Sequence, residues 1–131
     1  DIVEVVVSDN ASADETVNVV ESFRIKYKNI KYFCNAENLG SDENYINAVV
    51  KSTGRYSWLI GDDDFIVNGA LDFVLKFLSK NTVSIFTVEL KTFSSMFDII
   101  RSRTDISDLN VSFYNSYNEF FQKGYCVGGH Y

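Results

Sequence analysis

The sequence is poor in the residues that mark several protein classes. Its 131 residues include no proline, one histidine and two cysteines, Cys34 and Cys126. Without proline there is no obvious linker, and the length fits one domain or a piece of one. Two distant cysteines form neither a CxxC zinc motif nor a disulfide framework. We expect both thiols to be buried, reduced and structural, which favours a cytosolic protein.

Positive charge and long apolar runs are also scarce. The chain has 12 Lys and Arg residues against 18 Asp and Glu residues, a net charge of −6, which excludes a general nucleic-acid binder because phosphate backbones are held by clustered Lys and Arg. No apolar run approaches the roughly 20 residues of a membrane helix. The first residues, Asp1 to Glu4, lack the basic region of a signal peptide. We therefore expect a soluble domain in which a cation mediates any phosphate binding.

Apolar residues alternate between short runs typical of strands and stripes typical of helices. Strands are predicted at residues 3–7, 30–33, 56–60 and 83–88, and helices at 12–23, 41–53 and 69–78. The first helix begins with a capping box of Ser12 and Glu15, and Gly54 supplies a left-handed end to the second. Beyond residue 91 we expect a helix at 114–122 and a strand at 125–127. This order predicts an α/β fold with a parallel sheet.

Two of the predicted strands end in polar residues. Ser8 to Asn10 follow the first strand, and Gly61 to Asp64 follow the third. In an open α/β sheet, ligands bind at the carboxyl ends of strands. Three adjacent carboxylates repel one another, and Mg²⁺ or Mn²⁺ would compensate them through one or two carboxylates, waters and substrate phosphates. If the strand continues, Asp62 and Asp64 point the same way and share the cation, whereas Asp63 points away.

A local structural role competes with each functional role. Asp62 to Asp64 can cap the next helix or form a solvated turn. Asp9 can form an Asx-turn or a helix cap. For Asn38, Gly40 and Asn44, turn formation and helix capping are the interpretation that spacing alone favours. The occurrence of two acidic strand ends in one chain favours function for the aspartates.

Three segments together resemble the glycosyltransferases of family 2, which have the GT-A fold. They are Val5 to Ser12, Asn38 to Gly40 and Thr53 to Asp64, and both their order and their spacing match. Within the family, the Ser-Asp-Asn-Ala-Ser and Gly-Asp-Asp-Asp motifs are most similar to the abequosyltransferase-like bacterial enzymes. The resemblance covers about the first eighty residues. It implies an α/β, Rossmann-like three-layer sandwich with a mostly parallel sheet.

The resemblance also implies a donor site and a metal site. It assigns the donor nucleotide to Asp9, Asn38, Gly40, Asn44, Asp62 and Asp63. Asp9 would contact the base, and Asp62 and Asp64 would form the DXD motif that holds Mn²⁺ or Mg²⁺, the ribose and the diphosphate. No motif selects a catalytic base among the acidic residues of the later region, which are Asp98, Asp105 and Asp108.

The same resemblance divides the chain and suggests that it is incomplete. Residues 1–131 would form a single partial GT-A domain, with the nucleotide-sugar-binding part at 1–90 and the start of the acceptor part at 91–131. Such enzymes usually begin with a strand and a Pro-x-Tyr-Asn-Arg-like loop, and their acceptor region and catalytic base follow later. We therefore expect a fragment that lacks both ends and is inactive by itself.

The implied activity is an inverting, metal-dependent transfer of a hexosyl or deoxyhexosyl group. The donor would be a nucleotide-diphosphate sugar, and the acceptor a saccharide or lipid-linked saccharide in bacterial surface polysaccharide synthesis. The protein would be cytoplasmic, with peripheral association at the inner face of the cell membrane left open. The alternative is a non-catalytic module of the same fold that binds a nucleotide or a partner chain.

Overall fold

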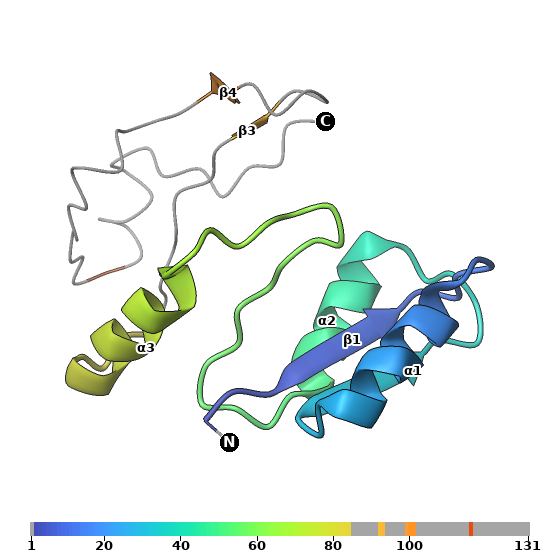
Figure 1. Cartoon of the computed structure of the whole chain (residues 1–131), viewed down its shortest axis with the longest axis horizontal. Coiled ribbons are helices and arrows are strands. Elements are labelled where there is room, and N and C mark those ends of the chain that lie inside the picture. Colours follow the sequence, from blue (N-terminus) through green and yellow to red (C-terminus); the bar gives the residue numbers. More distant parts are fainter. Residues whose placement is uncertain (1, 85–91, 94–98, 102–115, 117–131) are drawn as a thin grey trace. The chain divides into compact units, whose positions relative to one another are not determined.

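The computed structural model describes residues 2–84, 92–93, 99–101 and 116 (Figure 1). The chain divides into two compact units, Asp1–Leu71 and Asp72–Tyr131. In the described residues, no helix is both long and apolar enough to cross a membrane.

The first unit is built around a parallel pair of strands. Its elements are β1 (Val5–Asp9), α1 (Thr16–Lys26), β2 (Ile30–Cys34) and α2 (Ser41–Lys51). The register runs from Val5 opposite Ile30 to Asp9 opposite Cys34, and α1 makes the crossover that parallel strands require. Helix α2 packs beside β1 (Figure 1), and α1 contacts β2. The predicted α/β class and these two strands are confirmed.

The predicted start of α1 is wrong. The helix begins at Thr16, and Asp14 Oδ1 accepts the Thr16 backbone N–H at 2.9 Å, so Asp14 satisfies this first turn and Ser12 does not cap it. Ser12 is engaged elsewhere, because its N–H donates to Asp9 Oδ1 at 2.8 Å. Ala11, with φ 63°, also takes the left-handed conformation, which separates Ser12 from the helix.

The segment after α2 differs from the prediction as well. The helix ends at Lys51, and its C-cap residue, Ser52, is extended, with its N–H donating to the Val49 carbonyl at 3.1 Å. Gly54 is therefore not a left-handed cap; the positive-φ glycines of the described residues are Gly40 and Gly69. Residues 56–60 form no strand, because in the part of the chain that the structure describes they have no ladder partner.

The second unit holds most of α3 (Ala70–Lys80), which confirms the helix predicted at 69–78. Val74 on this helix is buried, as its apolar stripe predicts. Strands β3 (Thr92–Phe93) and β4 (Ile99–Arg101) form an antiparallel pair. Of the strand predicted at 83–88, residues 83–84 are not in a strand and the others lie outside the described residues. The helix predicted at 114–122, apart from residue 116, and the strand at 125–127 also lie outside them.

Candidate functional site

Asp9 lies at the carboxyl end of β1 and is only 5% exposed. Its Oδ1 accepts the Ser12 N–H at 2.8 Å, and its Oδ2 accepts the Tyr32 hydroxyl. Burial alone raises the pKa of Asp9, but the hydrogen bonds from Tyr32 and Ser12 outweigh it and hold the pKa below its ordinary value. The bond to Asp9 also raises the pKa of Tyr32. The site therefore contains a fixed, ionised acceptor beside a protonated phenol.

Asn10, the next residue, joins the end of β1 to the loop before α2. Its Nδ2 donates to Asn38 Oδ1 at 2.8 Å and to the Gly40 carbonyl at 3.2 Å. Its Oδ1 accepts the Leu39 N–H at 2.9 Å and Asn35 Nδ2 at 3.1 Å. One carboxamide thus holds three successive residues of the loop.

Asn44 makes a second connection, from α2 to β1. Its Oδ1 accepts the Ser8 hydroxyl at 2.8 Å and Asn35 Nδ2 at 3.1 Å. Its Nδ2 donates to the Ser8 carbonyl at 2.9 Å. These bonds fix the first turns of α2 against the strand that carries the buried carboxylate.

Four of the six residues predicted to bind the donor nucleotide therefore meet at one edge of the sheet. We call this group, together with its connecting residues, the Asp9 cluster; its members are Ser8, Asp9, Asn10, Tyr32, Asn35, Asn38, Gly40 and Asn44. Ser8 and Asn10 belong to a polar strand end that the sequence indicates. No sequence pattern indicates Tyr32 or Asn35.

The local structural roles that the sequence also allows for Asp9 and Asn38 are present in the structure as well. Asp9 accepts the backbone N–H of Ser12, and Asn38 Oδ1 accepts the backbone N–H of Gly40 at 2.9 Å. Both are Asx-type bonds that organise a turn. Gly40, with φ 83°, is the N-cap residue that immediately precedes α2. The turn bonds and a ligand role are compatible, because they fix the carbonyl and carboxylate groups that would face a nucleotide.

Asp62 and Asp63 lie at the tip of a turn, not along a strand. The Asp64 N–H donates to the Gly61 carbonyl at 3.2 Å, and the Gly61 N–H donates to Asp64 Oδ2 at 3.0 Å. A Cβ placed on Gly61 would lie 2.8 Å from Asp63 Oδ1 and 3.1 Å from Asp64 Oδ2. The carboxylates of Asp63 and Asp64 therefore both fold back over the glycine.

This turn changes the argument for the predicted metal ligands. The prediction that Asp62 and Asp64 point the same way while Asp63 points away assumed that the strand continues. That alternation does not apply to a turn. Among residues 2–84, 92–93, 99–101 and 116, no three His, Cys, Asp or Glu side chains are grouped so that they could hold a metal ion. A Mg²⁺ or Mn²⁺ ion that arrives with a diphosphate needs only one or two carboxylates. The exposed oxygens of this turn fit that requirement, and the metal roles of Asp62 and Asp64 stay predictions.

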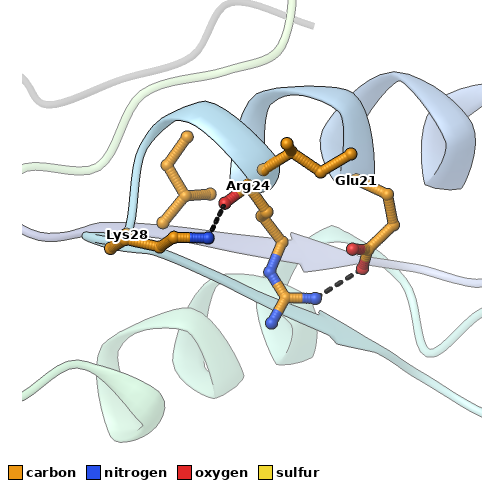
Figure 2. A pocket seen from close by; sticks show the side chains of 5 residues that line it. Glu21, Arg24 and Lys28 are labelled. Carbon is orange, nitrogen blue, oxygen red and sulfur yellow. Dashed lines mark hydrogen bonds and ion pairs between the residues drawn. The ribbon is translucent and has the colours of Figure 1, made fainter.

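A shallow pocket beside α1 contains no predicted site residue. Residues of α1 and the start of β2 line it, and Figure 2 shows Arg24 paired with Glu21 while Lys28 Nζ donates to the Arg24 carbonyl at 3.5 Å. The charges in this pocket are therefore engaged with one another or with the backbone of α1.

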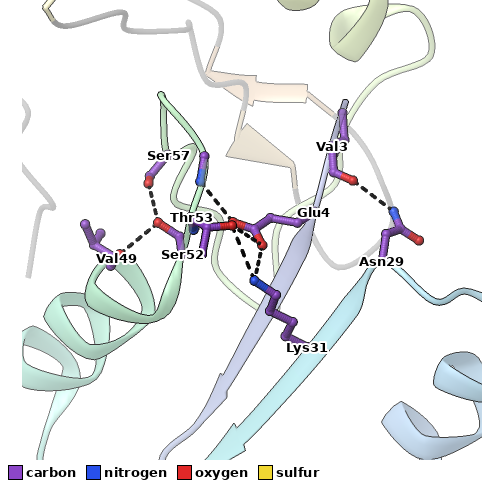
Figure 3. Close-up of polar contacts among 9 residues, drawn as sticks. Val3, Glu4, Asn29, Lys31, Val49, Ser52, Thr53 and Ser57 are labelled. Carbon is purple, nitrogen blue, oxygen red and sulfur yellow. Dashed lines mark hydrogen bonds and ion pairs between the residues drawn. The ribbon is translucent and has the colours of Figure 1, made fainter. Parts of the chain in front are cut away.

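Glu4 holds the segment that leads from α2 toward the acidic turn. Its carboxylate accepts the backbone N–H groups of Thr53 and Gly54, the latter at 3.0 Å, and pairs with Lys31 at 2.5 Å (Figure 3). The hydrogen bond from Lys31, followed by that from the Thr53 N–H, lowers the pKa of Glu4 from 4.5 to about 2. The network fixes the beginning of this segment to the amino-terminal side of the strand pair.

Cys34 corrects one further expectation. Its side chain is exposed, not buried, although it lies opposite Asp9 in the strand register. Cys34 is the last residue of β2, and it is the exposed one of the five residues of that strand. Cys126 and the acidic residues considered for a catalytic base lie outside the described residues.

The comparisons agree with the motifs at this edge of the sheet. The model of glycosyl transferase family 2 matches residues 1–130. The chain belongs to glycosyltransferase family 2. Membership implies the GT-A fold, and the parallel β1-α1-β2 unit of this family 2 chain fits it. No solved structure gives a significant match.

Three curated relatives match the family 2 chain over part of its length. The abequosyltransferase RfbV of Salmonella typhimurium is 35% identical over 77 residues, which are 58% of this chain and 23% of the relative. The GalNAc(5)-diNAcBac-PP-undecaprenol beta-1,3-glucosyltransferase of Campylobacter jejuni is 30% identical over 84 residues, 63% and 27% of the two chains. The uncharacterized glycosyltransferase MG025 of Mycoplasma genitalium is 30% identical over 81 residues, 61% and 27%. The matched region spans about a quarter of each relative.

Proposed function

We propose that this family 2 chain forms the donor site of a glycosyltransferase. The donor is a nucleotide-diphosphate sugar, and the protein transfers a hexosyl or deoxyhexosyl group to a saccharide or lipid-linked acceptor of a bacterial surface polysaccharide. The observation that carries the proposal is the convergence of Asp9, Asn38, Gly40 and Asn44 at the carboxyl edge of the parallel strands. The abequosyltransferase and the undecaprenol-linked glucosyltransferase among the relatives support the substrate class.

Asp9 binds the base in this proposal. An ionised carboxylate accepts hydrogen bonds only, so it selects a base edge that presents an N–H group. Its two hydrogen bonds, from Ser12 and Tyr32, keep it ionised and fix its orientation before the ligand arrives. Such preorganisation reduces the entropy lost on binding.

The acidic turn receives the diphosphate. Asp62 and Asp64 would hold Mn²⁺ or Mg²⁺, with Asp63 on the donor side. The missing side chain of Gly61 leaves room for the carboxylates of Asp63 and Asp64, which both approach it. The ion, when bound, supplies positive charge against the charge that develops on the leaving diphosphate. The transfer is an inverting displacement in which an acceptor hydroxyl attacks the anomeric carbon. Asp98, Asp105 and Asp108, the acidic residues considered as the base that removes its proton, lie outside the described residues.

Calorimetry tests the proposed donor site and its metal dependence. We expect the purified protein to bind a nucleoside diphosphate in the presence of Mn²⁺, and Asp64→Ala to weaken binding about ten-fold or more, because it removes a carboxylate from the cation. Asp72→Ala, which removes an exposed aspartate of α3, is the matched control and should bind like the wild type. Unchanged nucleoside diphosphate affinity in Asp64→Ala, or in the presence of a chelator, would contradict the proposed metal site.

The alternative is a non-catalytic module that uses the same site. It shares the Asp9 cluster and therefore the same nucleotide affinity, so binding alone does not separate the two functions. Incubation with radiolabelled nucleotide-sugars and a membrane fraction that contains lipid-linked saccharides does. Transfer of label to the lipid fraction supports the enzyme at the inner face of the cell membrane. Binding without transfer by the full-length protein, across all common donor sugars, supports the module.

A further inference from the structure

We propose that Asn10 is a positioning residue of the donor pocket. It holds the loop formed by Asn38, Leu39 and Gly40 in place relative to the base-binding Asp9 and does not itself contact the nucleotide. The inference rests on the proposed function, since it concerns the same pocket. Asn10 is not among the residues that the sequence motifs assign to the donor.

The hydrogen-bonding capacity of the Asn10 carboxamide is fully used. A primary amide has two N–H donors and an oxygen with two lone pairs. In Asn10 the donors reach Asn38 Oδ1 and the Gly40 carbonyl, and the oxygen accepts from Leu39 N–H and Asn35 Nδ2. A carboxylate or a hydroxyl in the same place would lose at least one of these bonds. Both polar atoms of the Asn10 side chain are therefore engaged within the loop.

The loop depends on this distant residue because its own cap is weak. Helix α2 begins after Gly40, which has φ 83°, and no side chain of the helix end bonds to the free N–H groups of its first turn. The loop is instead tied to a residue 28 to 30 positions earlier in the chain. Loss of Asn10 would release Asn38 and Gly40 together from β1, whereas Asp9 would keep its bonds to Ser12 and Tyr32.

The test compares Asn10→Ala with a matched amide at the other end of the strands. Asn29 also bridges two segments, because its Nδ2 donates to the Val3 carbonyl at 3.2 Å. Asn29→Ala therefore removes a connection of the same chemical kind, made by one side-chain hydrogen bond, away from the proposed donor site. Each variant is measured by Mn²⁺-dependent binding of a nucleoside diphosphate, by thermal unfolding, and by hydrogen exchange of the Leu39 and Gly40 amides. Asn10→Gln, which keeps the amide but is one methylene longer, replaces Asn10→Ala if the latter fails to fold.

We expect Asn10→Ala to bind the nucleoside diphosphate about ten-fold more weakly and to exchange the Leu39 amide about ten-fold faster. Asn29→Ala should lose less thermal stability, because it removes one side-chain hydrogen bond in place of four, and should keep wild-type affinity. Wild-type affinity in Asn10→Ala, or an equal loss in Asn29→Ala, would overturn the positioning role while leaving the donor site intact. Absence of binding by the wild-type protein would overturn the proposed function. Whether or not the wild-type protein binds, an unchanged exchange rate of the Leu39 amide in Asn10→Ala would show that Asn10 does not hold the loop in place.

Discussion

At the scale of single residues, the most informative feature is a buried carboxylate that the fold keeps ionised. Asp9 is buried, yet its pKa lies below the ordinary value because Tyr32 and Ser12 donate to it. A carboxylate in apolar surroundings without such partners would instead be protonated more easily. The fold therefore stabilises a charge at this position, which serves the turn that Asp9 organises and is also what the proposed ligand-binding role requires.

Tyr32→Phe tests this pair of residues directly. Removal of the hydroxyl should raise the pKa of Asp9, because the largest opposing hydrogen bond is lost while burial remains. Carbon-detected NMR titration of the Asp9 carboxyl group measures the shift. Nucleoside diphosphate affinity should fall as well, since the carboxylate is less firmly oriented. Tyr45→Phe, on the exposed side of α2, is the control. An unshifted Asp9 titration in Tyr32→Phe would show that the phenol does not set its ionisation.

At the scale of elements, two loops enter helices through a glycine with the same positive φ. Gly40 precedes α2 and Gly69 precedes α3, and both have φ 83° with no atom within 4 Å of the position that a Cβ would occupy. A substitution at either position therefore costs only the free energy of placing a residue with a side chain in the left-handed region. The two glycines therefore form a natural matched pair, of which only Gly40 belongs to the Asp9 cluster.

Gly40→Ala and Gly69→Ala should each lower the free energy of unfolding by about 1–2 kcal/mol, because both positions have a positive φ that an alanine adopts only at a cost. Chemical denaturation measures this cost. Only Gly40→Ala should also weaken nucleoside diphosphate binding, because the strained loop carries Asn38. If Gly69→Ala reduced the affinity to the same degree, the effect of Gly40 would reflect general stability and not the pocket.

The elements also show which parts of the fold a sequence can predict. The apolar runs at β1 and β2 are recognisable by their composition, and the apolar stripe of α3 by its helical spacing. The start of α1 is not, because Ser12 and Asp14 are both good caps, and a hydrogen bond to Asp9 decides between them. Residues 56–60 have an apolar strand-like composition, but a strand also needs a ladder partner, which composition cannot supply.

The residues of the candidate site also divide into those that the sequence predicts and those that only the structure shows. Motif order predicts Asp9, Asn38, Gly40 and Asn44, and the structure brings them together. The role of Asn10 emerges only from its four hydrogen bonds to residues far away in sequence. Polar networks of this kind depend on side-chain geometry, and local sequence patterns carry no record of it.

At the scale of the whole molecule, acidic groups link folding to pH. The chain has a net charge of −6, and several carboxylates are held ionised by hydrogen bonds, among them Glu4, Asp9 and Asp14. A group whose pKa is lower in the folded state stabilises the fold above its unfolded pKa and loses this contribution as pH falls. Acidification should therefore destabilise the molecule through these groups together.

Glu4→Gln should isolate one of these contributions. The folded pKa of Glu4 is about 2 and its ordinary value is 4.5, so its stabilisation is complete above pH 4.5 and disappears as the pH falls toward 2. Urea unfolding from about pH 7 to about pH 2.5 should show a wild-type advantage over Glu4→Gln that is constant at the upper end and narrows below pH 4.5. Glu37→Gln, an exposed loop substitution, is the control. An advantage that did not narrow in acid would contradict the role of the Glu4 charge.

The parallel pairing of β1 and β2 has a kinetic consequence. Val5 lies opposite Ile30, so the chain must close a span of 25 positions before the first ladder bond forms. Such a closure is entropically costly, whereas a helix forms from local contacts within about a microsecond. An early α1 shortens that span, since a helix rises only about 1.5 Å per residue. The rate at which β1 and β2 pair therefore depends largely on how readily residues 16–26 form helix α1 beforehand.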